Sequence, residues 1–293
     1  MEKTVSPTMP MVRTRTGQVV PQVGFGTFKI PAADTQRAVE EALELGYRHI
    51  DTAAAYNNED GVGAALKATG MEREVFVTTK LRNADQGRDS TLRAFEESRA
   101  KLGVDTLDLY LIHWPVPTQD RYVETWRTLL ELRDQGAIRA AGVSNFMVEH
   151  LERLAEETGE MPVVNQVESH PGYWQPELEA FCRERGIAIE AYSPLGHGGD
   201  IASEPALRAA ERLGVTPAQV VLRWHVQKGH IAIPKSTHPE RMRANLDVFS
   251  FELTVDEVAD LDALDAPENR CGNDPYTFAR PQTLEDMLSR GNL

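Results

Sequence analysis

The sequence predicts an α/β fold, the (β/α)8 or TIM barrel, and two observations lead to this fold class. Short apolar runs alternate with longer segments of helical periodicity along the 293 residues, and eight such runs occur. Successive runs end about 22 to 43 residues apart, which suits one strand and one crossover helix. A doubly wound sheet is the competing fold, but residues 24–29, GFGTFK, lack the G-x-G-x-x-G phosphate loop that usually follows its first strand.

The first predicted element is a β-hairpin. Residues 11–23, MVRTRTGQVVPQV, predict two short strands that turn at Thr16 and Gly17 and close the floor of the barrel. The eight barrel strands are expected, in chain order, at 22–28, 47–53, 74–80, 107–113, 140–146, 162–171, 187–196 and 230–236.

Helical segments separate these strands. Crossover helices are expected at 34–46, 89–103, 122–136 and 216–229, and a short extra helix at 203–214 fills the longest interval. The expected N-caps are Asp34, Ser90 and Thr216, and the glycines expected to end helices are Gly46, Gly103, Gly136 and Gly229. We therefore expect one domain over 1–293, with the hairpin at about 11–23, the barrel at about 23–265 and a tail at about 266–293.

Composition narrows the class of partner. The chain carries 31 basic and 45 acidic residues, a net charge of −14, and such a surface repels the phosphate backbone of nucleic acids. No stretch approaches the roughly 20 apolar residues of a membrane span, and residues 1–18 lack the apolar segment of a secretory signal. We expect a cytoplasmic protein without membrane contact, and a monomer.

The two cysteines, Cys182 and Cys271, show no metal-ligand spacing. A disulfide between them stays open on sequence alone, although reduced thiols are the expectation for a cytosolic protein. No histidine spacing suggests zinc, so we expect no metal site.

Four polar residues follow from the barrel topology, because chemistry in such barrels lies at the C-terminal ends of the strands. Asp51, Lys80 and His113 end the second, third and fourth predicted strands, and Tyr56 follows Asp51 by five residues. Each has an ordinary structural explanation when taken alone. Together, a carboxylate, a phenol, an ammonium and an imidazole at one rim suit proton donation to a carbonyl oxygen.

The ammonium is expected to tune the phenol. A free tyrosine has a pKa of about 10, which is high for an acid at neutral pH. An ammonium at about 4 Å attracts the phenolate by up to about 4 kcal/mol at an effective dielectric constant of 20. Half of that energy would lower the pKa of Tyr56 by more than about one unit. We therefore expect a lowered pKa for Tyr56, with Asp51 keeping Lys80 charged.

Several longer motifs resemble one known family, the aldo-keto reductases, over about residues 12–265. They are GYRHIDTAAAYNNEDGVGAAL (46–66), LDLYLIHWP (107–115), GAIRAAGVSNF (136–146), VVNQVESHP (163–171) and IPKSTHPERMRANLDVF (233–249). The segments ELRDQGAIRAAGVSNF and TPAQVVLRWHVQKG are most similar to the bacterial branch of the 2,5-diketo-D-gluconic acid reductases.

The resemblance implies NADPH-dependent reduction of aldehydes or ketones, with Tyr56 as general acid, Asp51 and Lys80 as its tuning pair and His113 as the group that orients the carbonyl. It implies a substrate pocket walled by Phe28, His113 and Trp114, and a tail that lies by the mouth of the active site. It implies cofactor contacts at Thr27, Ser144, Asn145, Gln166, Tyr192, Ser193, Leu195, Gly196, Lys235, Ser236, Thr237, Arg241 and Asn245. Here Ser144, Asn145 and Gln166 face the carboxamide, Tyr192 stacks on the nicotinamide, residues 193–196 follow the pyrophosphate and residues 234–241 hold the 2′-phosphate.

Two departures from the family pattern bear on specificity. Ala244 stands where many members have a glutamate for the adenine amino group, so NADH is expected to be usable but weaker than NADPH. Phe28 replaces a common tryptophan in the pocket wall. The substrate stays open among keto-sugar acids, α-dicarbonyls and simple aldehydes. Two other functions also stay open: a Schiff-base aldolase that uses Lys80, and a cofactor-binding regulatory subunit of the same fold.

Overall fold

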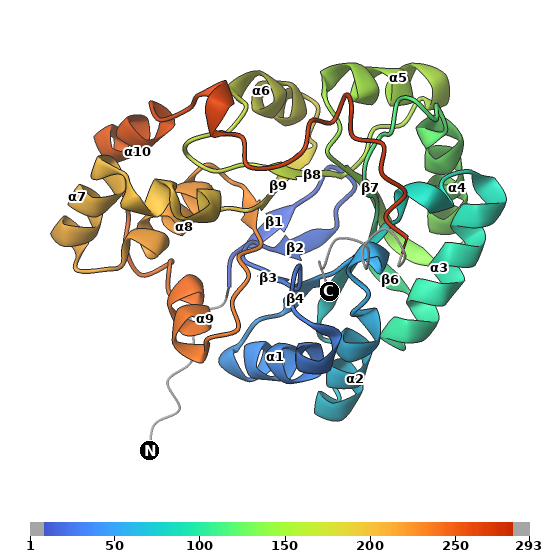
Figure 1. Ribbon diagram of the computed structural model, residues 1–293, viewed down its shortest axis with the longest axis horizontal. Coiled ribbons are helices and arrows are strands. Elements are labelled where there is room, and N and C mark those ends of the chain that lie inside the picture. The colour runs from blue at the N-terminus through green and yellow to red at the C-terminus, as the bar shows by residue number, and fades with distance from the viewer. Residues whose placement is uncertain (1–8, 284–293) are drawn as a thin grey trace.

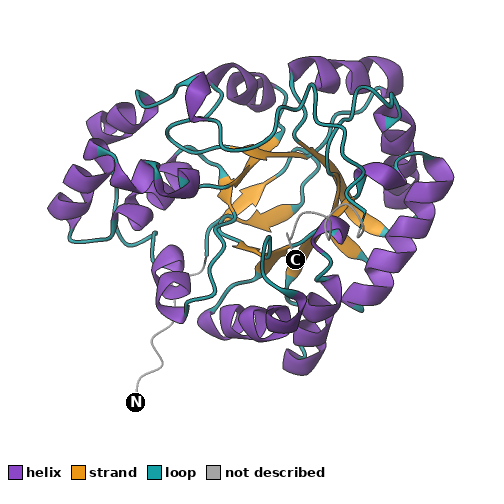
Figure 2. Ribbon diagram, viewed as in Figure 1, coloured by secondary structure: helices purple, strands orange, loops and turns teal. Residues whose placement is uncertain are grey.

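Eight parallel strands curl into one closed sheet with the helices outside it, as the computed structural model shows for residues 9–283 (Figure 1 and Figure 2). The strands, in sheet order, are β3 (Phe25–Gly26), β4 (His49–Asp51), β5 (Phe76–Leu81), β6 (Leu107–Ile112), β7 (Ile138–Ser144), β8 (Val164–Glu168), β9 (Ala188–Tyr192) and β10 (Ile231–Ala232). Backbone hydrogen bonds close the ring between its first and last strands, since Gly24 N–H donates to Ala232 O and Ala232 N–H donates to Gln22 O, both at 2.9 Å. The predicted (β/α)8 barrel is confirmed.

Ten α-helices lie in the part of the chain that the structure describes. They are α1 (Ala32–Leu45), α2 (Glu59–Thr69), α3 (Arg88–Leu102), α4 (Tyr122–Asp134), α5 (Val148–Thr158), α6 (Pro176–Glu184), α7 (Glu204–Leu213), α8 (Pro217–Gln227), α9 (Pro239–Leu246) and α10 (Val255–Asp262). Helix α7 is the predicted extra helix. Figure 2 shows the helices arranged around the strands, as expected when each crossover returns over the outside of the sheet.

The predicted helix ends are partly right. Thr216 caps α8 in a capping box with Gln219, and Gly46 and Gly103 end α1 and α3 in the left-handed conformation. Gly136 and Gly229 also have positive φ, one residue after the C-caps of α4 and α8.

Two predicted N-caps are wrong, because α1 and α3 begin earlier than expected. The N-caps are Pro31 and Gly87. Asp34 therefore lies in the first turn of α1, where its charge suits the helix dipole. The hydroxyl of Ser90 lies inside α3 and donates back to Gln86 O at 2.8 Å instead of accepting a backbone N–H.

The predicted hairpin lies at the N-terminal ends of the strands. Strands β1 (Met11–Arg13) and β2 (Val19–Pro21) pair antiparallel. Gln18 Nε2 donates to Arg139 O at 3.0 Å, and Arg15 donates to Met161 O at 2.6 Å. Both acceptors lie near the N-terminal ends of β7 and β8, so the hairpin covers the barrel floor as predicted.

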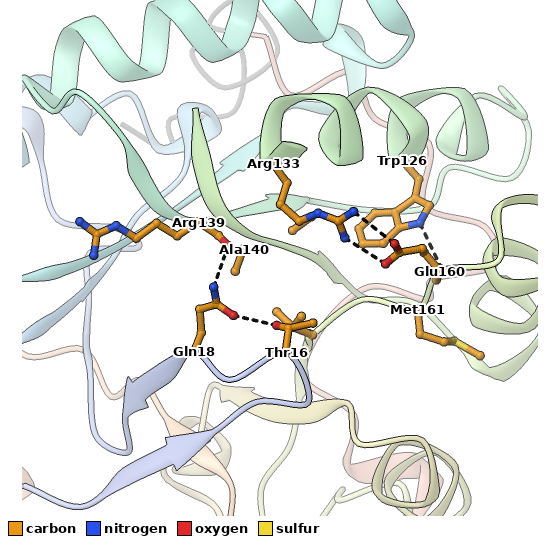
Figure 3. A pocket seen from close by; sticks show the side chains of 10 residues that line it. Thr16, Gln18, Trp126, Arg133, Arg139, Ala140, Glu160 and Met161 are labelled. Carbon is orange, nitrogen blue, oxygen red and sulfur yellow. Dashed lines mark hydrogen bonds and ion pairs between the residues drawn. The ribbon is translucent and has the colours of Figure 1, made fainter. Parts of the chain in front are cut away.

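A cavity of about 240 Å3 lies beside this hairpin (Figure 3). Trp126 and Arg133 of α4 reach Glu160 on its wall, with Arg133 Nη1 2.9 Å from a Glu160 carboxylate oxygen. Gln18 and Thr16 line its other side. The cavity is at the opposite end of the barrel from the C-terminal strand ends, and its charged side chains are all paired, Arg133 with Glu160 and Arg139 with Asp108. Chemistry in such barrels lies at the other end, at the C-terminal ends of the strands.

The barrel interior changes character along its axis. Leu109, Leu111, Ala140, Val163 and Val164 form a separate buried apolar cluster, which Phe76 and Ala188 extend. Residues two positions further along neighbouring strands point to the same interior because side chains alternate along a strand. Toward the C-terminal ends these inward positions become polar, as His113, Gln166 and Glu190 show, so the lower interior is hydrophobic and the upper interior carries the ionisable groups.

Helices α2 and α3 cross closely at Gly63. A Cβ atom built there would lie 2.1 Å from Lys101 O, which is backbone and cannot rotate away. Gly63→Ala should therefore destabilise the protein by about 1–3 kcal/mol, even though alanine is favoured over glycine in a helix by about 1 kcal/mol. Denaturant unfolding followed by circular dichroism would measure this change. The exposed control Ala68→Gly should lose only the helix propensity, and a more stable Gly63→Ala protein would contradict the close crossing.

Candidate active site

The four predicted polar residues meet at one rim of the barrel. Lys80 Nζ of β5 lies 2.7 Å and 2.9 Å from the two carboxylate oxygens of Asp51, the last residue of β4. The same nitrogen lies 3.3 Å from the hydroxyl of Tyr56, which ends a short 3-10 turn after β4. The rings of Tyr56 and His113 are 5.8 Å apart between centroids. The structure thus brings together residues that the sequence separates by up to 62 positions.

Strand register explains why Asp51 and Lys80 touch. Asp51 pairs with Thr78 across β4 and β5, and Lys80 is two residues further along β5. Side chains two apart on a strand share a face, so both residues point into the barrel. The lysine is fully buried there.

Every donor of the buried ammonium has an acceptor. Besides Asp51 and Tyr56, Lys80 Nζ donates to Thr52 O at 2.8 Å. One Asp51 oxygen also accepts from Gln166 Nε2 at 2.7 Å. The buried charges are therefore paired and hydrogen-bonded, as burial of ions requires.

The electrostatics at Tyr56 differ from the sequence-based expectation. Burial raises the pKa of Tyr56, and the attraction of the Lys80 ammonium opposes this without overcoming it, while Asp51 adds repulsion. The expected lowering was wrong because it counted the ammonium and left out the loss of solvation. At neutral pH the phenol keeps its proton.

The other three groups hold defined charge states. Burial on its own would lower the pKa of Lys80, but Asp51 and Tyr56 outweigh it and raise the pKa. Burial raises the pKa of Asp51 and Lys80 opposes it, and the bidentate contact with Lys80 favours the carboxylate. Burial, with Lys80 nearby, lowers the pKa of His113 well below its ordinary value, so this imidazole is neutral at pH 7.

A buried carboxyl that the sequence analysis missed lies beneath these residues. Glu190 of β9 pairs in register with Gln166 and is fully buried. Its oxygens make no hydrogen bond within residues 9–283, and His49 Nε2 is 3.6 Å away. Burial, together with the negative charge of Asp51, raises the pKa of Glu190 to about 8. The alternation IAIEAY places Glu190 on the same face as Tyr192, and this was the available signal.

The residues expected at the nicotinamide cluster at the ends of β7, β8 and β9. Ser144 Oγ donates to Gln166 O at 2.8 Å, and Asn145 Nδ2 donates to His113 O at 3.0 Å. The Tyr192 hydroxyl donates to Asn145 Oδ1 at 2.8 Å. These polar groups and the half-buried Tyr192 ring lie at the same rim as Tyr56 and His113.

Thr27 occupies a different position from these groups. It is fully buried, and its hydroxyl donates to Asp51 O at 3.0 Å. The hydroxyl therefore holds the backbone of Asp51, which makes Thr27 part of the support for the ion pair.

The segment after β9 turns sharply. Ser193 and Gly196 both have positive φ, and a Cβ on Gly196 would lie 2.2 Å from the Asp200 carboxylate. Ser193 Oγ is 3.2 Å from His197 Nε2, and Leu195 is partly buried between them. The glycine is required here because the loop packs against Asp200.

The predicted phosphate site lies at the start of α9. Lys235 and Arg241 are exposed, and no ion pair among residues 9–283 neutralises either of them. Ser236 Oγ accepts from His238 N–H at 3.1 Å, which orders the turn into the helix. Thr237 is partly buried and Asn245 is buried within α9. Two free cations at a helix N-terminus suit a bound phosphate.

Aromatic side chains wall the mouth of the barrel. The Phe28 ring, 48% exposed, lies 5.0 Å from the Tyr56 ring, and the Trp114 ring lies 4.4 Å from the Phe278 ring. Phe278 belongs to the tail, which hydrogen-bonds to the loop after β5 through Arg280 O and Pro281 O. Figure 1 shows this segment, in red, crossing the barrel from α10 toward α3. The expected tail over the active-site mouth is thus present.

The sequence profile of the Aldo/keto reductase family matches residues 22–199 and 201–266. The chain belongs to the aldo-keto reductase family. A Mycolicibacterium smegmatis aldo-keto reductase is 52% identical over 270 residues, covering 92% of this chain and 98% of that protein. Methylglyoxal reductase DkgA of Escherichia coli (strain K12) is 45% identical over 271 residues, with coverage of 92% and 98%. Among solved structures, a Gox0644 variant in complex with NADPH matches with a TM-score of 0.90 at 46% identity, covering 92% of this chain and 99% of that one.

Family membership and geometry agree on the kind of chemistry. Carbonyl reduction is the reaction that the aldo-keto reductase fold supports here. The Schiff-base alternative requires Lys80 to lose its proton and attack a carbonyl. The raised pKa of Lys80 opposes loss of its proton. The contacts of Nζ with Asp51, Thr52 and Tyr56 oppose attack on a carbonyl.

Two further sequence-based expectations concern cysteines and membranes. Cys182 is buried and Cys271 is exposed, and both thiols are free, so the possible disulfide is absent. None of the helices between residues 9 and 283 combines the length and apolar character of a membrane span.

The raised pKa of Glu190 generates a prediction about stability. In the folded protein the carboxyl keeps its proton up to about pH 8, whereas its ordinary value is 4.5. The folded state therefore binds the extra proton between these values, and the free energy of unfolding falls as the pH rises through this window. Glu190→Gln should remove this loss, so its stability relative to the wild type should increase from pH 5 to pH 8.5, by up to about 1.4 kcal/mol per pH unit.

Denaturant unfolding at several pH values would measure this difference. Glu44→Gln, on the exposed face of α1, is the matched control and should follow the wild-type curve. A Glu190→Gln curve parallel to the wild type would show that the carboxyl is ionised in the folded protein.

Proposed function

We propose that this aldo-keto reductase reduces small aldehydes and ketones, α-dicarbonyl compounds foremost, with Tyr56 as the proton donor. One observation carries the proposal: Lys80 Nζ lies between the carboxylate of Asp51 and the hydroxyl of Tyr56, at the rim that His113 shares. An acid beside a buried cation and a neutral hydrogen-bonding group is the arrangement that carbonyl reduction needs.

Tyr56 acts on the substrate oxygen. Because burial keeps the phenol protonated, a proton is available when negative charge develops on the carbonyl oxygen. The phenolate that remains lies beside the Lys80 ammonium, whose attraction offsets part of the cost of burying a negative charge. Asp51 keeps that ammonium charged and holds it beside the Tyr56 hydroxyl. Lys80 thus stabilises the phenolate that forms after Tyr56 has given up its proton.

His113 positions the carbonyl. Its imidazole is neutral, so one ring nitrogen carries a proton and can donate a hydrogen bond to the substrate oxygen. Asn145 holds the backbone of His113 through its carbonyl oxygen. The oxygen would then accept from both Tyr56 and His113, which fixes the carbonyl carbon on the side of Tyr192.

The family makes the chain an NADP-dependent oxidoreductase, and NADPH, when bound, supplies the hydride for the carbonyl carbon. Ser144, Asn145 and Gln166 would hold the carboxamide and Tyr192 would cover one face of the nicotinamide. Residues 193–196 would follow the pyrophosphate, and Lys235, Ser236, Thr237, Arg241 and Asn245 would surround the 2′-phosphate and adenosine. The free charges of Lys235 and Arg241 fit this phosphate.

Cofactor preference follows from the same site. Ala244 offers no carboxylate to the adenine amino group. Preference for NADPH over NADH therefore depends on the cations at the 2′-phosphate, and NADH should be a poorer but usable cofactor.

The proposed substrate class rests on the aromatic residues at the mouth of the barrel and on the names of similar proteins. Phe28, Trp114 and Phe278 make an aromatic wall beside Tyr56, which suits compact carbonyl compounds. Relatives in Escherichia coli and Yersinia pestis are named methylglyoxal reductase DkgA. A panel of methylglyoxal, a simple aldehyde and a keto-sugar acid, followed by NADPH consumption, would rank these classes. Equal or greater kcat/KM for the keto-sugar acid would overturn the α-dicarbonyl assignment.

We also propose that residues 1–293 work as one domain, a monomer in the cytoplasm. The tetrad of Asp51, Tyr56, Lys80 and His113 comes from one chain, so no second subunit is needed to complete it. The hairpin and the tail are each hydrogen-bonded to the barrel. Residues 1–8 and 284–293 of this domain lie outside the described part of the chain.

The first test of the mechanism is Tyr56→Phe. Removing the hydroxyl deletes the proton donor and keeps the ring, so turnover should fall roughly 100- to 10,000-fold. NADPH binding, measured by quenching of tryptophan fluorescence, should persist because the ring still fills its place. Tyr276→Phe, in the exposed part of the tail, is the control and should keep wild-type turnover. A rate near the wild type in Tyr56→Phe would refute the assignment.

The second test concerns the 2′-phosphate. Hydrogen bonds to charged groups contribute about 1.5–3 kcal/mol, so Arg241→Ala should raise the KM for NADPH roughly 10- to 100-fold. The KM for NADH should stay nearly unchanged, because NADH lacks this phosphate. Arg243→Ala removes the same charge two residues along α9 and serves as control. Equal losses for both cofactors would place Arg241 outside the phosphate site.

A further inference from the structure

A second group of ionisable side chains lies beside the active site and takes no part in the proposed reaction. Glu168 ends β8, His170 follows it, Asp200 begins a 3-10 turn after β9, and Cys271 lies in the tail. We call these four residues the tail cluster. Glu168 and Cys271 are 103 positions apart in the sequence, so no short spacing motif predicts the group.

Three members of the tail cluster converge on one point. His170 Nε2 lies 3.3 Å from Glu168 Oε1 and 4.0 Å from Cys271 Sγ, and one ligand atom from each residue lies within 4.8 Å of the others. Zinc bonds of about 2.0–2.3 Å to nitrogen, oxygen and sulfur place tetrahedral neighbours on the order of 3.3–3.6 Å apart. The 4.0 Å separation of Cys271 Sγ from His170 Nε2 is longer than this spacing, so the cysteine has to move inward when zinc binds.

The surroundings already orient two of these ligands. His170 Nδ1 lies 2.6 Å from Asp200 Oδ2, an ion-pair contact on the ring nitrogen opposite the one near Glu168 and Cys271. A carboxylate on the far nitrogen is the arrangement that zinc-binding histidines commonly have. The backbone N–H groups of Cys271 and Gly272 donate to the two oxygens of Glu168.

Access and ligand type point to the same metal. Glu168 and His170 are buried, while Cys271 is exposed, so an ion can enter from solvent and keep a water molecule as fourth ligand. Thiolate and imidazole ligands favour Zn2+ over Mg2+ or Ca2+, which prefer oxygen. Binding releases one proton from Cys271 Sγ and one from His170 Nε2, and no group changes its oxidation state.

We propose that the tail cluster is a Zn2+ site, with His170 Nε2, Cys271 Sγ and the Glu168 carboxylate as protein ligands and Asp200 as the partner that orients His170. The proposal differs from the sequence-based expectation of no metal site, which considered only spacing along the chain.

The site is placed to act on the reductase, and this consequence rests on the proposed function. Glu168, Asn145, Tyr192 and Arg270 line one recess. A Cβ on Gly272 would lie 2.6 Å from Glu168 and 3.2 Å from the Tyr192 hydroxyl, so the tail already touches the residue assigned to the nicotinamide. Zn2+ would join the tail to β8 at this point, and turnover should fall because exchange of the cofactor slows.

Binding is tested on the full-length protein after removal of metals by a chelator. Titration with Zn2+ against a chromophoric chelator should show one equivalent bound, and Cys271→Ser and His170→Gln should each weaken binding at least about tenfold. Cys182→Ser changes the other cysteine, on α6, and should bind as the wild type does. Co2+ in place of Zn2+ should give a thiolate-to-metal charge-transfer band that Cys271→Ser lacks.

Three outcomes would overturn the site: no binding, equal binding in wild type and Cys271→Ser, or no charge-transfer band with Co2+. The last two would leave the group as a structural imidazolium held between two carboxylates. These measurements need neither NADPH nor substrate, so they stand apart from the proposed function, and Tyr56→Phe should still bind Zn2+. The effect on the reductase is separate: Zn2+ should lower wild-type turnover and leave Cys271→Ser unaffected, and equal inhibition of both would refute it.

Discussion

The buried ion pair of Lys80 and Asp51 is the constraint on which the rest of the site depends. Removing two charges from water costs several kcal/mol for each ion unless every lone pair and proton finds a partner. Here Thr52 O, Gln166 and Tyr56 supply those partners. The pair can exist only where a closed sheet brings β4, β5 and β8 around one axis. The site therefore depends on closure of the barrel.

That pair also sets the charge states around it. Two carboxyl groups, Asp51 and Glu190, share the interior with one ammonium, and the carboxylate in direct contact with Lys80 takes the charge. Glu190 is left to hold a proton because its burial and the charge of Asp51 act in the same direction. The neutral His113 and the protonated Tyr56 follow from the same loss of solvation. A low-dielectric interior with one fixed cation thus leaves a protonated phenol and a neutral imidazole at the rim.

The C-terminal tail packs against the same rim of the barrel. It contributes Phe278 to the aromatic wall and meets Glu168 through the backbone of Cys271 and Gly272. The segment that shapes the substrate mouth is therefore anchored next to Tyr192. In the proposed function this anchor couples substrate selection to the cofactor contacts, and an ion in the proposed zinc site would act on both.

The sequence by itself determined the eight strands, the hairpin at Thr16 and Gly17, and the rim that carries Asp51, Tyr56, Lys80 and His113. These follow from alternation and helical periodicity, which are local properties, and from the rule that parallel strands end at one edge. Local patterns already failed at Asp34 and Ser90, where Pro31 and Gly87 start the helices earlier. Only the tertiary structure decided the direction of the Tyr56 pKa shift, the raised pKa of Glu190 and the meeting of Glu168, His170 and Cys271. Burial and contact depend on what the rest of the chain places around a residue, and no window of sequence contains that information.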